Sequence, residues 1–172
     1  MAVLPIQCYP APVLKKVAAQ ITVFDDELAA LAADMVETMY AAPGLGLAAP
    51  QVNVSQRLIV LDCAGSDEPA DLIVAVNPHI VERDGEVCEE EGCLSVPGYN
   101  AVVKRSAWVH VRYQTLDGSA AEREAEGLLA VCFQHEIDHL DGKLFVDRLS
   151  PLKRSIFRKK YKKILQEQQE SA

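Results

Sequence analysis

The sequence predicts a small α+β domain, in which strands gather in the middle of the chain between helices and a further helix ends the chain. Its 172 residues can bury one substantial hydrophobic core, so a single domain over residues 1–172 is expected. Strand-like segments gather in the middle of the chain and do not alternate with helices as they do in parallel sheets. A helix-like, apolar run over about residues 126–140 follows them.

The first predicted helix covers residues 25–40. Its apolar residues recur at helical spacing, and three acidic residues suit the positively polarised first turn. Residues 1–20 are interrupted by proline and are expected to wrap around the body. Pro43-Gly44 ends the helix, and residues 44–51 are expected to form a short loop.

The next segments have the composition of strands. Strands are predicted over residues 57–62 and 72–77. Asp84-Gly85 lies between strand-like residues 80–83 and 86–90, and this arrangement predicts a β-hairpin.

Two further elements are predicted before the chain ends. Residues 108–115 alternate between apolar and polar side chains, and Asp117-Gly118 predicts a second hairpin turn. Ser150-Pro151 can begin a last helix that runs over residues 151–168 and belongs to the same domain.

The composition is that of an ordinary globular protein, with 49% hydrophobic and 24% charged residues. No apolar stretch is long enough to cross a membrane, and the N-terminus lacks the basic and apolar regions of a secretory signal. Five cysteines without an export signal indicate reduced thiols, some of which are free to bind metal. A cytoplasmic protein without membrane contact is therefore expected.

Charge is distributed unevenly. Residues 1–151 hold 10 Lys/Arg and 23 Asp/Glu, a net −13, whereas residues 152–172 hold 7 Lys/Arg and 2 Asp/Glu, a net +5. The last helix is therefore basic on an acidic body. It suits a polyanionic partner, although a solvated surface helix explains the same pattern.

The motif His135-Glu136-Ile137-Asp138-His139 carries the strongest chemical signal. Histidines four apart on a helix share one face, so both imidazoles can bind one metal ion. Glu136 lies beside them and can move protons for a metal-activated water. The helix predicted over about residues 126–140 is thus a candidate metal-binding helix.

A catalytic site needs a third protein ligand. No histidine follows His139, and glutamate follows only at Glu167 and Glu170, so this ligand is expected upstream. Cys93, in a turn-rich segment after a strand, is the best candidate. The alternatives are the thiols of Cys63, Cys88 and Cys132, while His79 and His110 are expected to be structural or exposed.

Cys132 raises the alternative of a closed Cys2His2 structural site. It lies seven residues before His139, about 10 Å along the helix axis, which is too far for a shared ion. Cys132 is better explained as a pocket wall or a packed small side chain.

The segment Gly44-Leu45-Gly46-Leu47-Ala48-Ala49 superficially fits a dinucleotide fingerprint. That fingerprint requires a strand before it and a helix after it, whereas here a helix precedes it and Pro50 follows. No nucleotide cofactor is therefore expected. Glycines allow close approach to a ligand, and the amide of Gln51 can stabilise a developing oxyanion.

Three segments, 44–51, 91–95 and 135–139, together resemble the signature motifs of the peptide deformylase family, and the similar layout extends over nearly the whole chain. The resemblance implies an enzyme that removes the formyl group from the N-terminal formyl-methionine of new polypeptides and releases formate. It implies one divalent metal per chain on Cys93, His135 and His139. Iron(II) is expected natively, with zinc, nickel or cobalt as substitutes. The fold that the resemblance implies is a small α+β unit, with antiparallel sheets packed around a central metal-binding helix.

The resemblance also implies roles for other residues. A metal-activated water attacks the formyl carbon with Glu136 as general base and acid, while Gln51 and the Leu94 N–H stabilise the oxyanion. Substrate is expected to lie against a set of loop and helix residues: Gly44, Leu45, Gly46, Leu128, Val131 and Cys132.

One stretch departs from the family pattern. Many members carry an arginine where this chain has Gly98-Tyr99-Asn100, so a relative with altered substrate choice is an alternative. We also expect a buried ion pair between Glu91 and Arg105 to fix the Cys93 loop. By resemblance, the basic C-terminal helix docks on ribosomal RNA.

Two other functions compete with this interpretation. A general zinc peptidase predicts cleavage of internal peptide bonds and a downstream third ligand. A structural-metal module that binds RNA through its tail predicts a fourth protein ligand and no hydrolysis.

Overall fold

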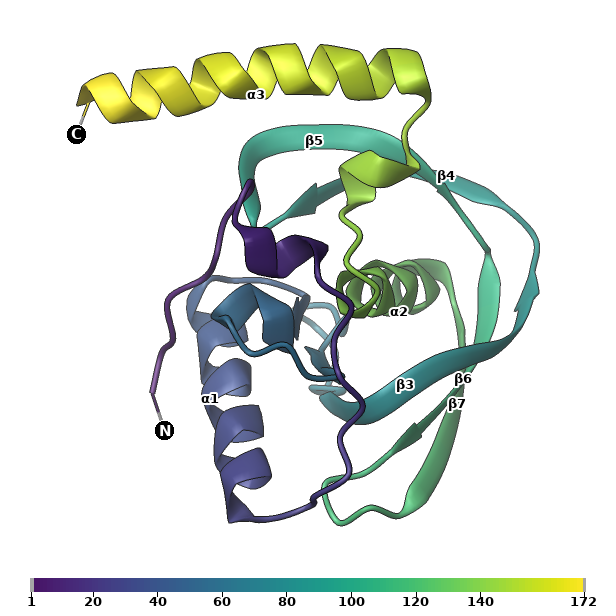
Figure 1. Ribbon diagram of the computed structural model, residues 1–172. Coiled ribbons are helices and arrows are strands. Elements are labelled where there is room, and N and C mark those ends of the chain that lie inside the picture. Colours follow the sequence, from purple (N-terminus) through teal and green to yellow (C-terminus); the bar gives the residue numbers. More distant parts are fainter. Residues whose placement is uncertain (1, 172) are drawn as a thin grey trace.

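Residues 2–171 are described by the structure, a computed structural model (Figure 1). The three α-helices are α1 (Asp26–Ala41), α2 (Gly127–Leu140) and α3 (Pro151–Ser171). The strands are β1 (Gly46–Ala48), β2 (Leu58–Leu61), β3 (Ile73–Asp84), β4 (Val87–Cys93), β5 (Val96–Arg105), β6 (Trp108–Gln114) and β7 (Ala120–Glu126). Short 3-10 helices are η1 (Pro12–Lys15), η2 (Ala49–Val52) and η3 (Phe145–Arg148).

The strands form two antiparallel sheets with α2 between them, which confirms the predicted α+β class. The larger sheet has the order β1-β2-β3-β6-β7, and the smaller one pairs β4 with β5. In Figure 1, α2 is seen nearly end-on between the large sheet and the β4–β5 pair, while α3 lies across β5. Within the described residues, no helix is both long and apolar enough to span a membrane.

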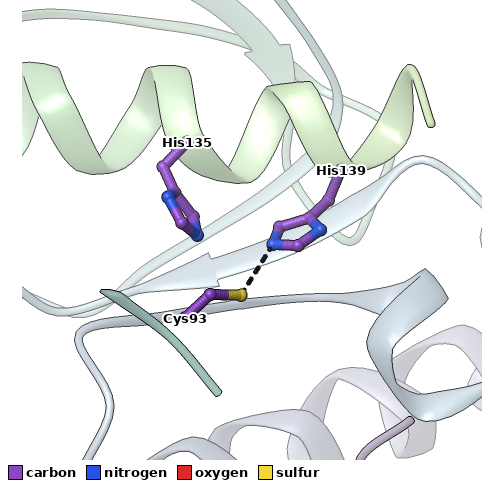
Figure 2. A group of neighbouring side chains, drawn as sticks. All are labelled: Cys93, His135 and His139. Carbon is purple, nitrogen blue, oxygen red and sulfur yellow. Dashed lines mark hydrogen bonds between the residues drawn. The ribbon is translucent and has the colours of Figure 1, made fainter. Parts of the chain in front are cut away.

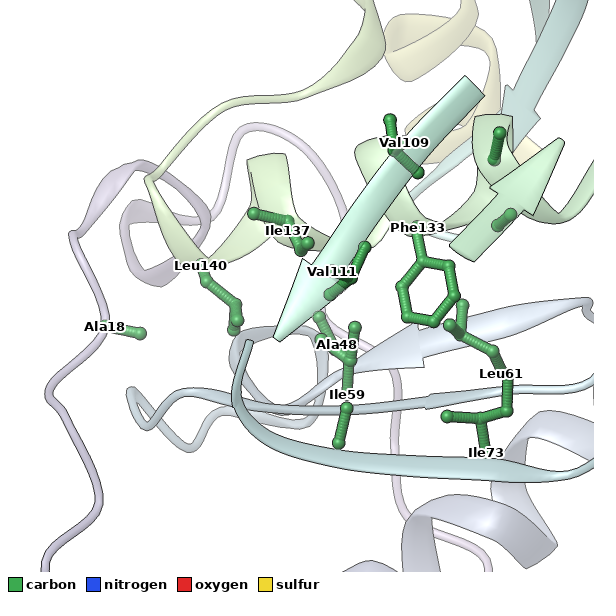
Figure 3. Close-up of a cluster of buried hydrophobic side chains, with 13 residues drawn as sticks. Ala18, Ala48, Ile59, Leu61, Ile73, Val109, Val111, Phe133, Ile137 and Leu140 are labelled. Carbon is green, nitrogen blue, oxygen red and sulfur yellow. The ribbon is translucent and has the colours of Figure 1, made fainter. Parts of the chain in front are cut away.

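The main core lies between α2 and the large sheet (Figure 3). Apolar side chains of α2 recur at spacings of three and four, and one helix face is therefore buried. These residues are Ala130, Phe133, Ile137 and Leu140. The sheet residues packed in the same cluster include Ile59, Leu61, Val109 and Val111. This packing fixes the rotation of α2 and hence the direction of its opposite face.

The helix ends lie close to their predicted positions. The Asp25 side chain accepts a hydrogen bond from the Leu28 N–H at 3.0 Å and caps α1. α2 starts at Gly127, one residue after the predicted start, and ends at Leu140 as predicted. α3 extends to Ser171, three residues beyond the predicted end.

The predicted hairpin at Asp84-Gly85 is wrong. The predicted strands 72–77 and 80–83 form one continuous strand, β3, which pairs with β6. Gly85, at φ +69°, instead carries the chain from the large sheet into the small one. Turn residues specify a change of direction, but the packing of whole strands decides which of them pair.

Two further segments differ from the sequence prediction. Residues 44–51 are not entirely a loop, because β1 forms an edge strand on β2 and η2 follows it. β5 was not predicted, since Pro97, Gly98 and Asn100 interrupt its apolar pattern. The hairpin at Asp117-Gly118 is confirmed by the pairing of β6 with β7.

An aromatic cluster fastens α3 to the body. Phe157 and Tyr161 of α3 are 2% and 1% exposed, and both rings meet Tyr9 of the N-terminal segment. Tyr99 of β5 packs edge-on against Phe157 at a centroid distance of 4.8 Å. The helix is therefore part of the folded unit, although its far end projects beyond the sheets (Figure 1).

Candidate metal centre

Cys93, His135 and His139 converge between α2 and the end of β4 (Figure 2). Each offers one ligand atom, and these atoms lie within 4.8 Å of one another. The two histidines project from the same side of α2, as their spacing of four requires. Cys93 ends β4 and reaches them from the opposite side, where a tight connection turns the chain into β5.

The three donors suit a divalent transition metal. The Cys93 Sγ and His139 Nε2 atoms are 3.4 Å apart. Ligands of a tetrahedral zinc-like ion, at their usual bond lengths, lie about 3.5 Å apart. One thiolate and two imidazoles, with no fourth side chain from the described residues in the group, leave a coordination position for water or substrate. Cys132 is not part of the group, which argues against a closed Cys2His2 site.

A buried carboxylate orients His135. Its Nδ1 atom lies 3.0 Å from the Glu91 carboxylate, so Nε2 is the nitrogen left for a ligand. Burial acts to lower the pKa of His135, but hydrogen bonds to Cys93 and Glu91 outweigh it and hold the pKa well above its ordinary value. For His139, burial and the nearby charge of His135 lower the pKa well below its ordinary value.

The expected buried ion pair between Glu91 and Arg105 is confirmed, and it belongs to a larger network. Arg105 donates two hydrogen bonds to Glu91, both at 2.8 Å, and a third to Asp138 at 2.6 Å. Arg148 of η3 binds Asp138 from the other side at 2.6 and 3.0 Å. Burial acts to raise the pKa of Glu91 and of Asp138, but their arginine partners outweigh it and lower both.

Glu136 lies beside the ligand group in a dry environment. It is 3% exposed, and one carboxylate oxygen is 3.9 Å from His139 Nε2. Burial raises the pKa of Glu136 to about 7. A carboxylate with such a pKa can accept and return a proton near neutral pH.

Gln51 is held rigidly behind Cys93. Its side-chain oxygen accepts a hydrogen bond from the Ala48 N–H at 2.9 Å, and its Nε2 donates to the Ser95 hydroxyl at 3.0 Å. The same Nε2 lies 3.6 Å from Cys93 Sγ. An amide donor therefore points at the ligand group.

A pocket of about 400 Å³ opens beside this centre. Its lining includes most of the residues predicted to contact substrate or to act in catalysis: Leu45, Gly46, Gln51, Cys93, Leu94, Leu128, Val131, Cys132, His135 and Glu136. Gly44 is not among its lining residues and lies next to the Leu94 side chain. A hydrogen bond to Cys63 and burial raise the pKa of the Cys132 thiol, which keeps it uncharged in the pocket wall.

The other two histidines, and the residues that depart from the family pattern, lie away from the ligand group. His79 is exposed on β3, and His110 on β6 lies 3.3 Å from Glu122. Neither Tyr99 nor Asn100 lines the pocket, and Tyr99 supports α3 instead. The departure from the family pattern therefore lies outside the pocket lining.

Sequence reasoning did not find Asp138, Arg148 or Ser95. Asp138 had a signal, because a carboxylate between two ligand histidines on a buried helix face requires a cationic partner. Arg148 and Ser95 had none, since only the tertiary arrangement brings them to Asp138 and Gln51.

Known proteins resemble this chain over nearly its whole length. The polypeptide deformylase family model matches residues 3–155. A peptide deformylase of Syntrophobacter fumaroxidans is 54% identical over 167 residues, which cover 97% of this chain and 98% of the relative.

Solved structures are similar as well. A crystal structure of a peptide deformylase from Legionella pneumophila matches with a TM-score of 0.88 at 49% identity, over 97% of this chain and 98% of that one. A peptide deformylase from Ehrlichia chaffeensis in complex with actinonin matches with a TM-score of 0.88 at 39% identity, over 95% and 98% of the two chains.

Proposed function

The chain belongs to the polypeptide deformylase family, and we propose that it hydrolyses the formyl group from N-terminal formyl-methionine of new polypeptides in a metal-dependent reaction. The observation that carries this proposal is the convergence of Cys93, His135 and His139 beside a buried Glu136 at the wall of a pocket.

We propose that these three side chains hold one divalent ion, natively iron(II), with zinc, nickel or cobalt as substitutes. When bound, such an ion supplies Lewis acidity and lowers the pKa of water at the site. Glu91 supports this role because it fixes the ring of His135 in the orientation a ligand needs.

Glu136 is the proposed proton carrier. Its carboxylate accepts the proton of the attacking water and then donates it to the leaving amine, as formate departs. The pKa of about 7 supports both steps, because neither the charged nor the neutral form is strongly favoured at neutral pH. A bound cation would favour the charged form, which is the one that accepts the proton.

The formyl oxygen gains negative charge during the attack. The Gln51 amide is the proposed side-chain donor, since its oxygen is anchored at Ala48 and its nitrogen faces Cys93. The Leu94 N–H is the proposed second donor. Donors held before the reaction stabilise the charge without having to reorganise.

The pocket suits a methionine side chain. Leu128, Val131 and Cys132 of α2 give it an apolar wall, and Leu45 stands at the rim. β1 is an edge strand that pairs only with β2 among the described strands, so its free edge can bind an extended peptide through Gly46. We propose that the substrate backbone lies along this edge.

Formate release from formyl-Met-Ala-Ser tests the proposal, with protein loaded anaerobically with iron(II) and its metal content measured. Glu136→Gln should lower kcat by about 10²–10⁴-fold while the protein keeps its metal, because only proton transfer is lost. Glu170→Gln, on the exposed end of α3, is the matched control and should retain activity. Absence of release by the folded, metallated protein would reject the proposal, and cleavage of internal peptide bonds would favour a general peptidase.

We also propose that α3 docks on ribosomal RNA, where formylated chains emerge. Seven cationic residues lie on it, and all but Arg154 are exposed: Lys153, Arg154, Arg158, Lys159, Lys160, Lys162 and Lys163. The buried aromatic side of the helix holds it to the body, so the basic side is left for a polyanion.

A further inference from the structure

A second cavity, of about 220 Å³, lies behind the metal centre. Its walls come from the end of β3, the end of β5, α2 and η3. The lining residues are Arg83, Gly85, Glu86, Lys104, Arg105, Ser106, Gln134 and Arg148. Glu91 lines the substrate pocket and its partner Arg105 lines this cavity, so their buried ion pair separates the two.

The lining is strongly cationic. Four basic side chains face one lining carboxylate, Glu86, which forms an exposed pair with Lys104 at 3.1 Å. Behind the wall, Glu91 and Asp138 neutralise Arg105 and Arg148. The four cations therefore face three carboxylates, which leaves one positive charge unpaired. This charge is that of Arg83, because no carboxylate of residues 2–171 forms an ion pair with Arg83.

The three guanidinium groups also keep unused hydrogen-bond donors. A guanidinium has five N–H groups. Arg105 directs three of them to Glu91 and Asp138, and Arg148 directs two to Asp138. Arg83 makes a single long contact, 3.5 Å, with the Gln134 side-chain oxygen. Several donors therefore border the same cavity without a carboxylate partner in the described chain.

We propose that this cavity binds a phosphate group, held by Arg83, Lys104 and the free N–H groups of Arg105 and Arg148. Phosphate fits this lining better than a carboxylate, because a tetrahedral oxyanion accepts hydrogen bonds from donors that converge from several directions. The Lys104 and Arg148 side chains are 65% and 39% exposed, so the group can enter from solvent or as part of a larger molecule.

The proposed phosphate binding does not rest on the proposed deformylation. Its occupant would hold Arg105, which holds Glu91 and through it His135. Because the ligand binds only the folded protein, it should raise the melting temperature as its concentration rises above Kd.

Calorimetric titration with inorganic phosphate, at constant pH and ionic strength, tests the proposal on the full metallated chain. The wild type should bind saturably, and Arg83→Gln/Lys104→Gln should bind at least about tenfold more weakly, since charge-assisted hydrogen bonds are lost. Arg112→Gln/Lys143→Gln removes two exposed cations outside this cavity and should bind like the wild type. The rise in melting temperature on adding phosphate should follow the same order as the phosphate affinities. If the Arg83→Gln/Lys104→Gln variant does not fold, Arg83→Gln alone replaces it.

A second arm identifies the source of the phosphate. A short single-stranded RNA without terminal phosphates is titrated into the same three proteins. If RNA binds more weakly only to the cavity variant, the site takes a phosphodiester. If only the binding of inorganic phosphate is weakened in that variant, the site takes free phosphate. Absence of saturable phosphate binding together with RNA affinity that is unaffected by the cavity variant would overturn the proposal, as would equal binding by all three proteins.

Discussion

Gly46 occupies a position where any side chain would collide with the carboxylate of Glu136, the proposed proton carrier. A β-carbon there would lie 2.9 Å from Cγ and Oε2 of Glu136, and 2.9 Å from Cδ2 of Leu61. Glycine is required by this close approach and not by an unusual backbone conformation. Gly46 therefore lets the free edge of β1 run directly past Glu136.

Gly46→Ala should lower kcat/KM for a formylated peptide by roughly a hundredfold, because displacing Glu136 by a fraction of an ångström spoils its alignment. Overpacking should also reduce the free energy of unfolding by about 1–3 kcal/mol. Steady-state kinetics, metal analysis and urea unfolding measure these effects. Gly65→Ala, in an exposed loop where the nearest side chain is 3.8 Å away, is the control. Full activity in Gly46→Ala would show that Glu136 has more room than the structure gives it.

The raised pKa of His135 predicts that metal binding releases protons. In the metal-free protein the raised pKa favours the charged imidazole, and the metal must displace that proton. About one proton per ion should therefore be released from His135. Calorimetry in buffers of different ionisation enthalpy counts the released protons. The Glu91→Gln variant should release fewer protons on metal binding and should bind metal about 10–100-fold more weakly. A wild-type protein that releases no protons on metal binding would contradict the prediction.

At the residue scale, the sequence predicted what one helix determines. The spacing within α2 places His135, Glu136 and His139 without knowledge of the rest of the chain. Cys93 lies more than forty residues earlier in the sequence. Residue chemistry alone did not decide which of four thiols is the third ligand, and only the family pattern identified Cys93.

At the scale of elements, four segments meet through buried charge. Glu91 of β4, Arg105 of β5, Asp138 of α2 and Arg148 of η3 form one continuous network. The small sheet therefore gains its position on α2 from ion pairs as well as from apolar packing. Because Glu91 also holds His135, the placement of the small sheet and the geometry of the metal centre depend on the same contacts.

Arg105→Ala should lower the free energy of unfolding by about 3–5 kcal/mol, because it leaves the buried Glu91 without its arginine partner and Asp138 with Arg148 alone. Metal retention during dialysis should fall with it. Lys104→Ala, the neighbouring residue in an exposed pair, should cost less than about 1 kcal/mol. Chemical unfolding and metal analysis of both variants test this, and equal stabilities would show that the network contributes little.

The same elements mark the limit of prediction from sequence. The helix positions were predicted to within a few residues, because helical apolar spacing depends only on residues that are close together in the sequence. The pairing of β4 with β5, and of β3 with β6, depends on contacts between distant segments. The sequence around Asp84-Gly85 resembles a hairpin turn, and no local signal distinguishes it from a crossing between sheets.

At the scale of the molecule, α3 has a buried aromatic side and an exposed basic side. Phe157 and Tyr161 bury it against Tyr9 and Tyr99, so deleting the helix would remove part of a core. Truncation after Leu152 is therefore a poor test of ribosome binding, because it would also destabilise the body. Substitution of exposed cations separates the two roles.

Lys159→Gln/Lys160→Gln/Lys163→Gln should weaken ribosome binding and make it less dependent on salt, because fewer counterions are released from RNA. Each lost phosphate contact should reduce the slope of log K against log salt by about 0.7–0.9. Co-sedimentation with ribosomes over a salt series measures both. Lys15→Gln/Lys16→Gln/Lys143→Gln, exposed lysines outside α3, is the matched control. Identical affinities and slopes for the two variants would remove the proposed role of α3.

The central position of α2 also constrains how this enzyme can evolve. Nine of its 14 residues are buried, and the helix supplies core packing together with two of the proposed metal ligands and the proposed proton carrier. Most changes on α2 therefore reduce fitness whatever else they achieve. Under selection by an antibiotic that fills the pocket, resistance mutations should arise instead at exposed rim positions such as Leu45 and Glu89, where the side chain can change without loss of fold or chemistry.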